Sequence, residues 1–186
     1  MPKNLASQLA KALRGNILVK FTRPFEEGAV KGYVLDIGPQ FFLTAVLAGD
    51  GIWFNGFQCF RLTDVRGLQV PHKYAAFNEA VLKKRRQGMP TKPRVSVASI
   101  QDLLQSANRA FPLVTIHREK ADPDVCHIGR VVGLAAGRVS LLEIGPDAAW
   151  DKKPETYRLS QITRVDFGGD YEEGLHLIGG RPKRDR

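Results

Sequence analysis

One stretch of the chain, residues 32–70, recurs without a gap as residues 129–167, so the two copies are displaced by 97 positions. Average composition would give about two identical pairs in such an alignment. The copies share six: Gly32/Gly129, Val34/Val131, Asp50/Asp147, Trp53/Trp150, Arg61/Arg158 and Leu62/Leu159. Apolar positions also correspond, as in Phe60/Tyr157, Val65/Ile162 and Leu68/Val165. A repeat of this kind indicates that one supersecondary unit is built twice.

The repeat divides the 186-residue chain into two domains. We assign residues 1–88 to the first domain, 89–98 to a linker and 99–186 to the second domain. Each repeat holds roughly 70 residues, a size at which a single core is only modestly stable. We therefore expect packing between the domains, or oligomerisation, to add stability.

The chain is basic, with a formal net charge of +9 and a sequence pI of about 9.8. A basic excess favours polyanionic partners, which makes nucleic acid the leading class. The N-terminal residues show no apolar run that resembles a signal peptide, and no segment approaches the ~20 apolar residues of a membrane span. We expect a cytoplasmic protein with no membrane partner, in which Cys59 and Cys126 are reduced.

No catalytic motif is found in the sequence. A phosphate loop, a dinucleotide fingerprint, a nucleophile elbow and a zinc-protease helix are all missing. Cys126 and His127 are adjacent, which is not the separated-pair spacing of a zinc site, even with His117 and His176 considered. We predict a non-enzymatic protein with no catalytic residues, no metal and no cofactor.

Local patterns predict a helix followed by five short strands in each copy. Leu5, Leu9 and Leu13 recur every fourth residue and define an amphipathic helix. Ser99 caps the corresponding helix of the second copy, whose predicted buried side consists of Ile100, Leu103, Leu104 and Ala107. Further helices are expected at residues 74–86 and 171–178. Strands are expected at residues 17–21, 33–37, 40–47, 57–62 and 65–70, and again at 113–117, 129–135, 138–144, 156–159 and 162–167.

Five strands on one helix suggest a small closed barrel, because closure removes exposed sheet edges. The predicted fold class is mainly β with short helices. It consists of two tandem five-stranded β-barrels, each preceded by an N-terminal helix.

This arrangement resembles the Sm-like (LSm) small-barrel family. Gly32 and Gly129 each open the long second strand, as the glycine of the family's first motif does. Residues 65–70, with Arg66 and Gly67, resemble the family's second motif of hydrophobic-Arg-Gly-x-x-hydrophobic. The resemblance covers both repeats and implies barrels that pair edge to edge through strands four and five, often in rings that bind RNA. It makes Arg66 a candidate for contact with nucleic acid.

Basic side chains supply the other candidates for nucleic-acid binding. Arg61 and Arg158 lie on the outward face of the fourth strand by alternation, where each can bind phosphate or pair with a carboxylate such as Asp64. The densest group, here named the basic cluster, can contact phosphates or simply answer the dipole at a helix C-terminus. It consists of Lys83, Lys84, Arg85 and Arg86. The C-terminal tail adds Arg181, Lys183, Arg184 and Arg186.

Trp53 and Trp150 are expected in the same loop of each copy, where a tryptophan can stack on a base or, as we favour, cover the barrel end. The leading functional hypothesis is binding of RNA, or of single-stranded nucleic acid generally, through basic surface. The alternative is a protein-assembly module that pairs strand edges and binds no nucleic acid.

Overall fold

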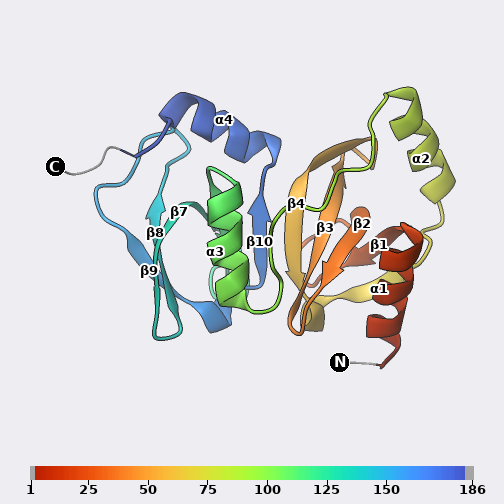
Figure 1. Ribbon diagram of the computed structural model, residues 1–186, viewed down its shortest axis with the longest axis horizontal. Coiled ribbons are helices and arrows are strands. Elements are labelled where there is room, and N and C mark those ends of the chain that lie inside the picture. The colour runs from red at the N-terminus through yellow and green to blue at the C-terminus, as the bar shows by residue number, and fades with distance from the viewer. Residues whose placement is uncertain (1–2, 183–186) are drawn as a thin grey trace. The chain divides into compact units, whose positions relative to one another are not determined.

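The computed structural model describes residues 3–182, in which the chain forms two compact, mainly β units (Figure 1). Unit 1 consists of Met1–Pro93 with Val97–Ser99, and unit 2 consists of Arg94–Ser96 with Ile100–Arg186.

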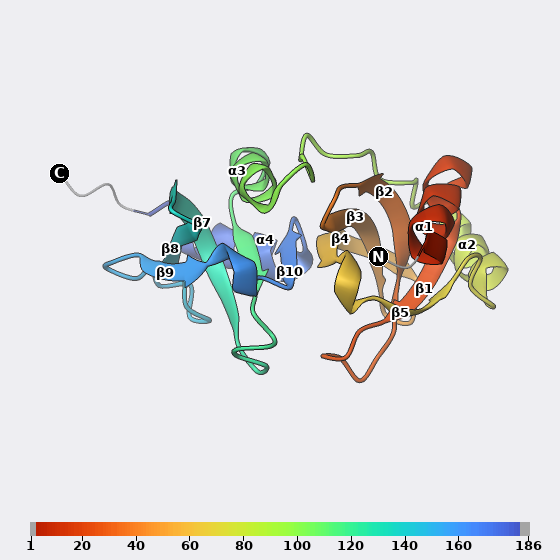
Figure 2. The same cartoon turned by 90° about the horizontal axis from the view of Figure 1, so that it is seen from below.

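Unit 1 contains a helix, five strands, a short 3-10 helix and a second helix. In chain order they are α1 (Lys3–Gly15), β1 (Leu18–Thr22), β2 (Val30–Ile37), β3 (Phe41–Ala48), β4 (Trp53–Arg61), η1 (Leu62–Asp64), β5 (Arg66–Gln69) and α2 (Ala75–Lys84). The helix α1 packs on β2 (Figure 2).

Unit 2 repeats this series of elements. They are α3 (Ile100–Ala110), β6 (Val114–His117), β7 (Cys126–Ala135), β8 (Arg138–Glu143), β9 (Glu155–Arg158), η2 (Leu159–Gln161), β10 (Arg164–Phe167) and α4 (Asp170–Gly179). The helix α3 packs on β6 and β7, and the four residues predicted to be buried on it are buried.

The two units have the same strand order, and their first four strands pair in the same register. The order is β5-β1-β2-β3-β4 in unit 1 and β10-β6-β7-β8-β9 in unit 2, and the pairs within each unit are antiparallel. Val19 pairs with Gly32 in unit 1, and Val114 pairs with Gly129 in unit 2. The second strand has an irregularity at the same place in both units, after Val34 and after Val131. The repeat predicted from the sequence is therefore present in the strand pairing.

Neither unit shows the closed barrel that we predicted. In each described unit the fifth strand pairs with the first, and no pairing joins it to the fourth. The reason lies in the connection, because η1 and η2 separate strands four and five by one helical turn. Their first residues, Leu62 and Leu159, are buried, which anchors that turn in the core. The result is an open five-stranded sheet in each unit.

The fourth strand also differs from the prediction. In unit 1 it begins at Trp53, so this residue lies in β4 and not in a loop. Trp150 forms an isolated bridge with Ile144 at the corresponding place in unit 2. Both tryptophans therefore belong to the sheet margin.

Aromatic packing fills the core of unit 1. The Phe21 ring lies 5.5 Å from the Phe42 ring and 5.0 Å from the Phe60 ring, both edge to face. Leu9 and Ala12 of α1 belong to the same buried cluster. Such ring pairs add about 0.5–1.5 kcal/mol each beyond the area they bury.

A glycine in the second strand is required in both units for steric reasons. A Cβ atom at Gly32 would lie 2.4 Å from the carbonyl oxygen of Ala45, and one at Gly129 would lie 2.0 Å from the carbonyl oxygen of Leu142. The second strand approaches the third so closely that no side chain fits between them.

Candidate nucleic-acid interface

Two loops meet at the same place in each unit. In unit 1 the amide of Leu62 donates to the carbonyl oxygen of Gln40 at 2.9 Å, which joins the β2–β3 loop to η1. In unit 2 the amide of Leu159 donates to the carbonyl oxygen of Gly137, also at 2.9 Å. We call each of these junctions a loop pair. Arg61 and Arg158 immediately precede the two donors, so the repeat places one arginine at each loop pair.

The loop pair of unit 1 encloses a hollow of about 210 Å³. Arg61 is half-buried there, and its guanidinium lies 5.5 Å from the centre of the Phe41 ring. Stacking holds the guanidinium plane in place, which prepares it for contact with a flat or anionic group. The lining residues are Pro39, Gln40, Arg61, Leu62 and Thr63.

The loop pair of unit 2 carries two arginines. Arg158 of β9 lies directly opposite Arg138 of β8 in the register, and both are exposed. Within residues 3–182 neither arginine takes part in an ion pair. Like charges at directly opposite positions destabilise a sheet, and an anion between them removes that cost. Arg138 was not among the predicted site residues.

Arg66 lies in β5, as the sequence predicts, and it is exposed. Its Nη1 donates to the carbonyl oxygens of Thr63 and Val65, both at 2.8 Å. Thr63 also lines the hollow beside Arg61, so the structure brings Arg61 and Arg66 to the two sides of one short turn.

The basic cluster lies elsewhere in unit 1. Its four residues are exposed at the C-terminal end of α2, where they also complement the helix dipole. The guanidinium of Arg85 is 5.9 Å from the Trp53 ring, at the start of β4. Arg61 ends the same strand, about 25 Å away at the rise of an extended strand. The cluster and the loop pair are therefore two separate basic surfaces of unit 1.

Both tryptophans are half-buried. The indole Nε1 of Trp150 donates to the carbonyl oxygen of Gly179 at 3.1 Å. Of the four basic tail residues, Arg181 is described and exposed, and Lys183, Arg184 and Arg186 lie outside the described residues.

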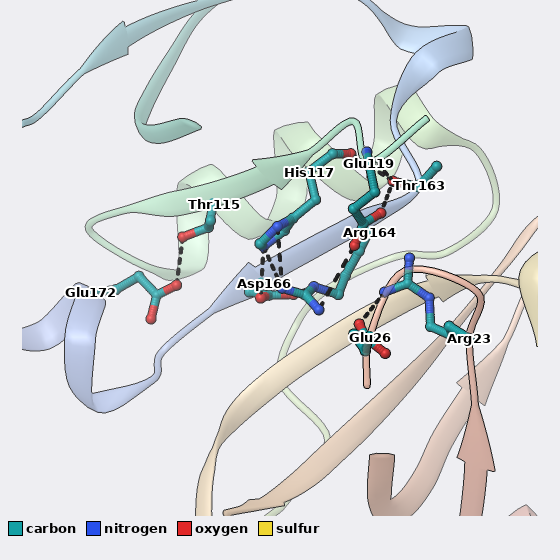
Figure 3. A network of polar contacts seen from close by, with 9 residues as sticks. All are labelled: Arg23, Glu26, Thr115, His117, Glu119, Thr163, Arg164, Asp166 and Glu172. Carbon is teal, nitrogen blue, oxygen red and sulfur yellow. Dashed lines mark hydrogen bonds and ion pairs between the residues drawn. The ribbon is translucent and has the colours of Figure 1, made fainter. Parts of the chain in front are cut away.

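A buried polar network in unit 2 joins β6, β10 and α4 (Figure 3). The Nε2 atom of His117 lies 3.0 Å from Oδ2 of Asp166, and Nε of Arg164 lies 3.2 Å from Oδ1 of the same carboxylate. Thr115 donates to Glu172 of α4 at 2.5 Å. His117 of β6 and the Arg164 guanidinium both contact the Asp166 carboxylate of β10, and the Thr115–Glu172 hydrogen bond links β6 to α4.

A second polar network joins β7, β8 and β9. The Tyr157 hydroxyl donates to Glu143, and Nδ1 of His127 lies 2.9 Å from that hydroxyl and 3.2 Å from Glu143 Oε2. Burial and the adjacent Glu143 carboxylate raise the pKa of Tyr157. Burial opposes ionisation of Glu143 too, but the hydrogen bonds from His127 and Tyr157 outweigh it and lower the pKa of that carboxyl. The network keeps Glu143 charged and Tyr157 neutral, so that the hydrogen bonds between β7, β8 and β9 are maintained.

The histidines and cysteines considered as metal ligands do not converge. Within the described residues no group of three or more His, Cys, Asp or Glu side chains is placed to hold a metal ion. Cys59 is buried and Cys126 is exposed, and neither forms a disulfide with another described residue. The helices between residues 3 and 182 are too short or too polar to cross a membrane.

Comparison of the chain with protein-family models, curated proteins and solved structures found no match.

Proposed function

We propose that this chain is a non-enzymatic, Sm-like tandem protein that binds RNA, or single-stranded nucleic acid generally, at its loop pairs. The observation that carries the proposal is the recurrence of an arginine at the same junction in both units, Arg61 in one and Arg158 in the other. Arg138 doubles the positive charge in unit 2. The net charge of +9 supports an anionic ligand.

The Sm-like part of the proposal is supported by the order of elements. Each unit has a helix, then five strands in the order fifth-first-second-third-fourth, with a glycine packed against a carbonyl in the second strand. These features agree with the resemblance drawn from the sequence.

The expected mode of binding is phosphate contact without a choice of base, since guanidinium groups on strands and turns are suited to phosphate oxygens. Arg61, Arg138 and Arg158 together offer about three phosphate contacts, and for single strands the logarithm of affinity falls by about 0.7 per contact with the logarithm of salt. A slope near −2 follows from the loop pairs alone. A steeper slope indicates that the basic cluster also takes part.

Fluorescence anisotropy with a labelled, structureless RNA oligonucleotide over a series of salt concentrations tests the proposal. We expect saturable binding at low salt and a loss of about tenfold or more in affinity for Arg61→Gln combined with Arg158→Gln. Lys11→Gln, which removes an exposed charge on α1, is the matched control. Absence of binding at low salt removes the proposal, and wild-type affinity of the double variant removes the loop pairs as the interface.

The second candidate is a protein-assembly module, favoured by the strand order. Within each unit the order ends on the fourth strand at one side and on the fifth at the other, the strands through which Sm-like proteins pair. Light scattering on nucleic-acid-free protein separates the two functions. A defined oligomer with no affinity for RNA favours assembly.

A further inference from the structure

A cationic hollow of about 620 Å³ lies in unit 2 between the C-terminal ends of α3 and α4. Arg109 comes from the last turn of α3, Arg130 from β7 and His176 from the last turn of α4, and Arg181 follows that helix. No carboxylate is among the described residues that line it. The other lining residues are Asn108, Ala110, Phe111, Pro112 and Pro182.

The arginines of this hollow are available to a ligand. Arg130 is held by two backbone acceptors, since its Nη1 donates to Pro112 at 2.8 Å and its Nη2 donates to Asn108 at 3.2 Å. In the part of the chain that the structure describes, Arg109, Arg130 and Arg181 form no ion pair. A guanidinium fixed by carbonyl oxygens keeps its full charge, because carbonyl groups do not neutralise it.

His176 adds a ring nitrogen to the hollow. Its Nδ1 lies 3.1 Å from the carbonyl oxygen of Gly180, and a carbonyl only accepts, so Nδ1 carries the hydrogen. The second ring nitrogen, Nε2, is then an acceptor in the neutral ring and a donor in the imidazolium. The imidazolium form favours an anion in the hollow.

Unit 1 has different side chains at the positions of Arg130 and His176. The fold therefore does not require these two residues. Under the displacement of 97, Tyr33 stands where unit 2 has Arg130, and Glu79 stands where it has His176. The Tyr33 hydroxyl donates to Glu79 at 3.4 Å, so in unit 1 this position is occupied by an internal pair that carries negative charge. Unit 2 has an arginine and a histidine at these two positions instead.

A second hollow, of about 720 Å³, shares Arg181 and Pro182 with the first. Its walls are mainly apolar, and Val132 is 55% exposed there. Trp150 presents part of its indole to this hollow while its Nε1 is held by Gly179. The remaining lining residues are Leu142, Asp151, Lys152 and Pro154.

We propose that the joined hollows of unit 2 bind a nucleoside phosphate, with the phosphate among Arg109, Arg130 and Arg181 and the base against Trp150. A phosphate monoester carries about −1.5 to −2 charges near pH 7 and three acceptor oxygens, which matches several unpaired guanidinium groups better than a carboxylate does. Aromatic side chains bind bases by stacking whatever their sequence. The same chemistry is found in a free mononucleotide and in the 5′-phosphorylated end of a nucleic acid. This site is separate from the loop pairs, and its test does not depend on them.

The test uses the full-length chain with Trp53→Phe, so that Trp150 is the remaining tryptophan and its fluorescence reports on unit 2. The probes are AMP, adenosine and inorganic phosphate. We expect AMP to bind saturably with a change in Trp150 emission and adenosine to bind at least about tenfold more weakly.

Arg109→Gln combined with Arg181→Gln removes two exposed side chains and should preserve the fold while weakening AMP binding about tenfold or more. Arg14→Gln, at the position in α1 that corresponds to Arg109, is the matched control. Adenosine binding as tight as AMP, wild-type affinity in the double variant, or no saturable AMP binding each overturns the proposal. A comparison of AMP with oligonucleotides that carry either a 5′-phosphate or a 5′-hydroxyl shows whether the ligand is a free nucleotide or the end of a nucleic acid. A preference for the phosphorylated oligonucleotide over AMP assigns the site to nucleic-acid ends, and equal affinity assigns it to free nucleotides.

Discussion

Replacing Gly129 by alanine should destabilise unit 2 by about 3 kcal/mol, the upper end of the usual cost of overpacking a core. The added Cβ would lie 2.0 Å from the carbonyl oxygen of Leu142, 2.8 Å from its carbon and 2.9 Å from the Cα atom of Glu143. All three are backbone atoms, so rotation of a side chain cannot relieve the conflict. Strands β7 and β8 must separate, which stretches their hydrogen bonds.

Urea-induced unfolding of the full chain, followed by Trp150 fluorescence in a Trp53→Phe background, measures this cost. Gly174→Ala is the control, since no atom lies within 4 Å of its added Cβ and the residue is inside α4. Alanine there should stabilise the helix by about 0.5–1 kcal/mol. An unfolding midpoint of Gly129→Ala at or above that of the parent would refute the steric reasoning.

Two other side chains give separate tests. Burial and the Glu79 carboxylate raise the pKa of Tyr33 to about 12, above the ordinary value of 10, so its contribution to stability is complete below pH 10 and falls as pH rises toward 12. Tyr33→Phe should give a flatter loss of stability over that range and remove one late-titrating tyrosine from the ultraviolet absorbance; an unchanged titration curve contradicts this. Thr44 is fully buried and its Oγ1 has no hydrogen-bond partner among the described residues, while unit 2 has the apolar Leu141 at the corresponding position. Thr44→Val should therefore raise the free energy of unfolding by about 1 kcal/mol, and a decrease would show that the hydroxyl has a favourable interaction.

Elements in which buried residues recur at a regular spacing along the sequence could be predicted. The buried face of α3 depends on residues three and four apart, and the displacement of 97 is kept where the second strand pairs with the third in both units. Barrel closure was predicted wrongly because it depends on where η1 and η2 direct the chain, which no local pattern encodes. The first half of β4 was missed because residues 53–58 are all half-buried and show no alternation.

The residues of the candidate site that occur in both copies of the repeat could be predicted from the sequence, and the others could not. Arg61 and Arg158 stand out because they are identical in the two copies. Arg138 has no such signal, since its importance comes from lying opposite Arg158 across two strands. The cationic hollow of unit 2 draws its polar side chains from α3, β7, α4 and the segment after α4, and only the fold brings them together.

The shared register of the two units means that the scaffold tolerates wide divergence at its surface. Few residues are identical, yet both copies keep a glycine against a carbonyl in the second strand and a buried leucine before the fifth. These few shared residues are enough to give both units the same backbone arrangement. The pair Tyr33 and Glu79 in one unit and the pair Arg130 and His176 in the other therefore occupy corresponding positions of the repeat with different chemistry.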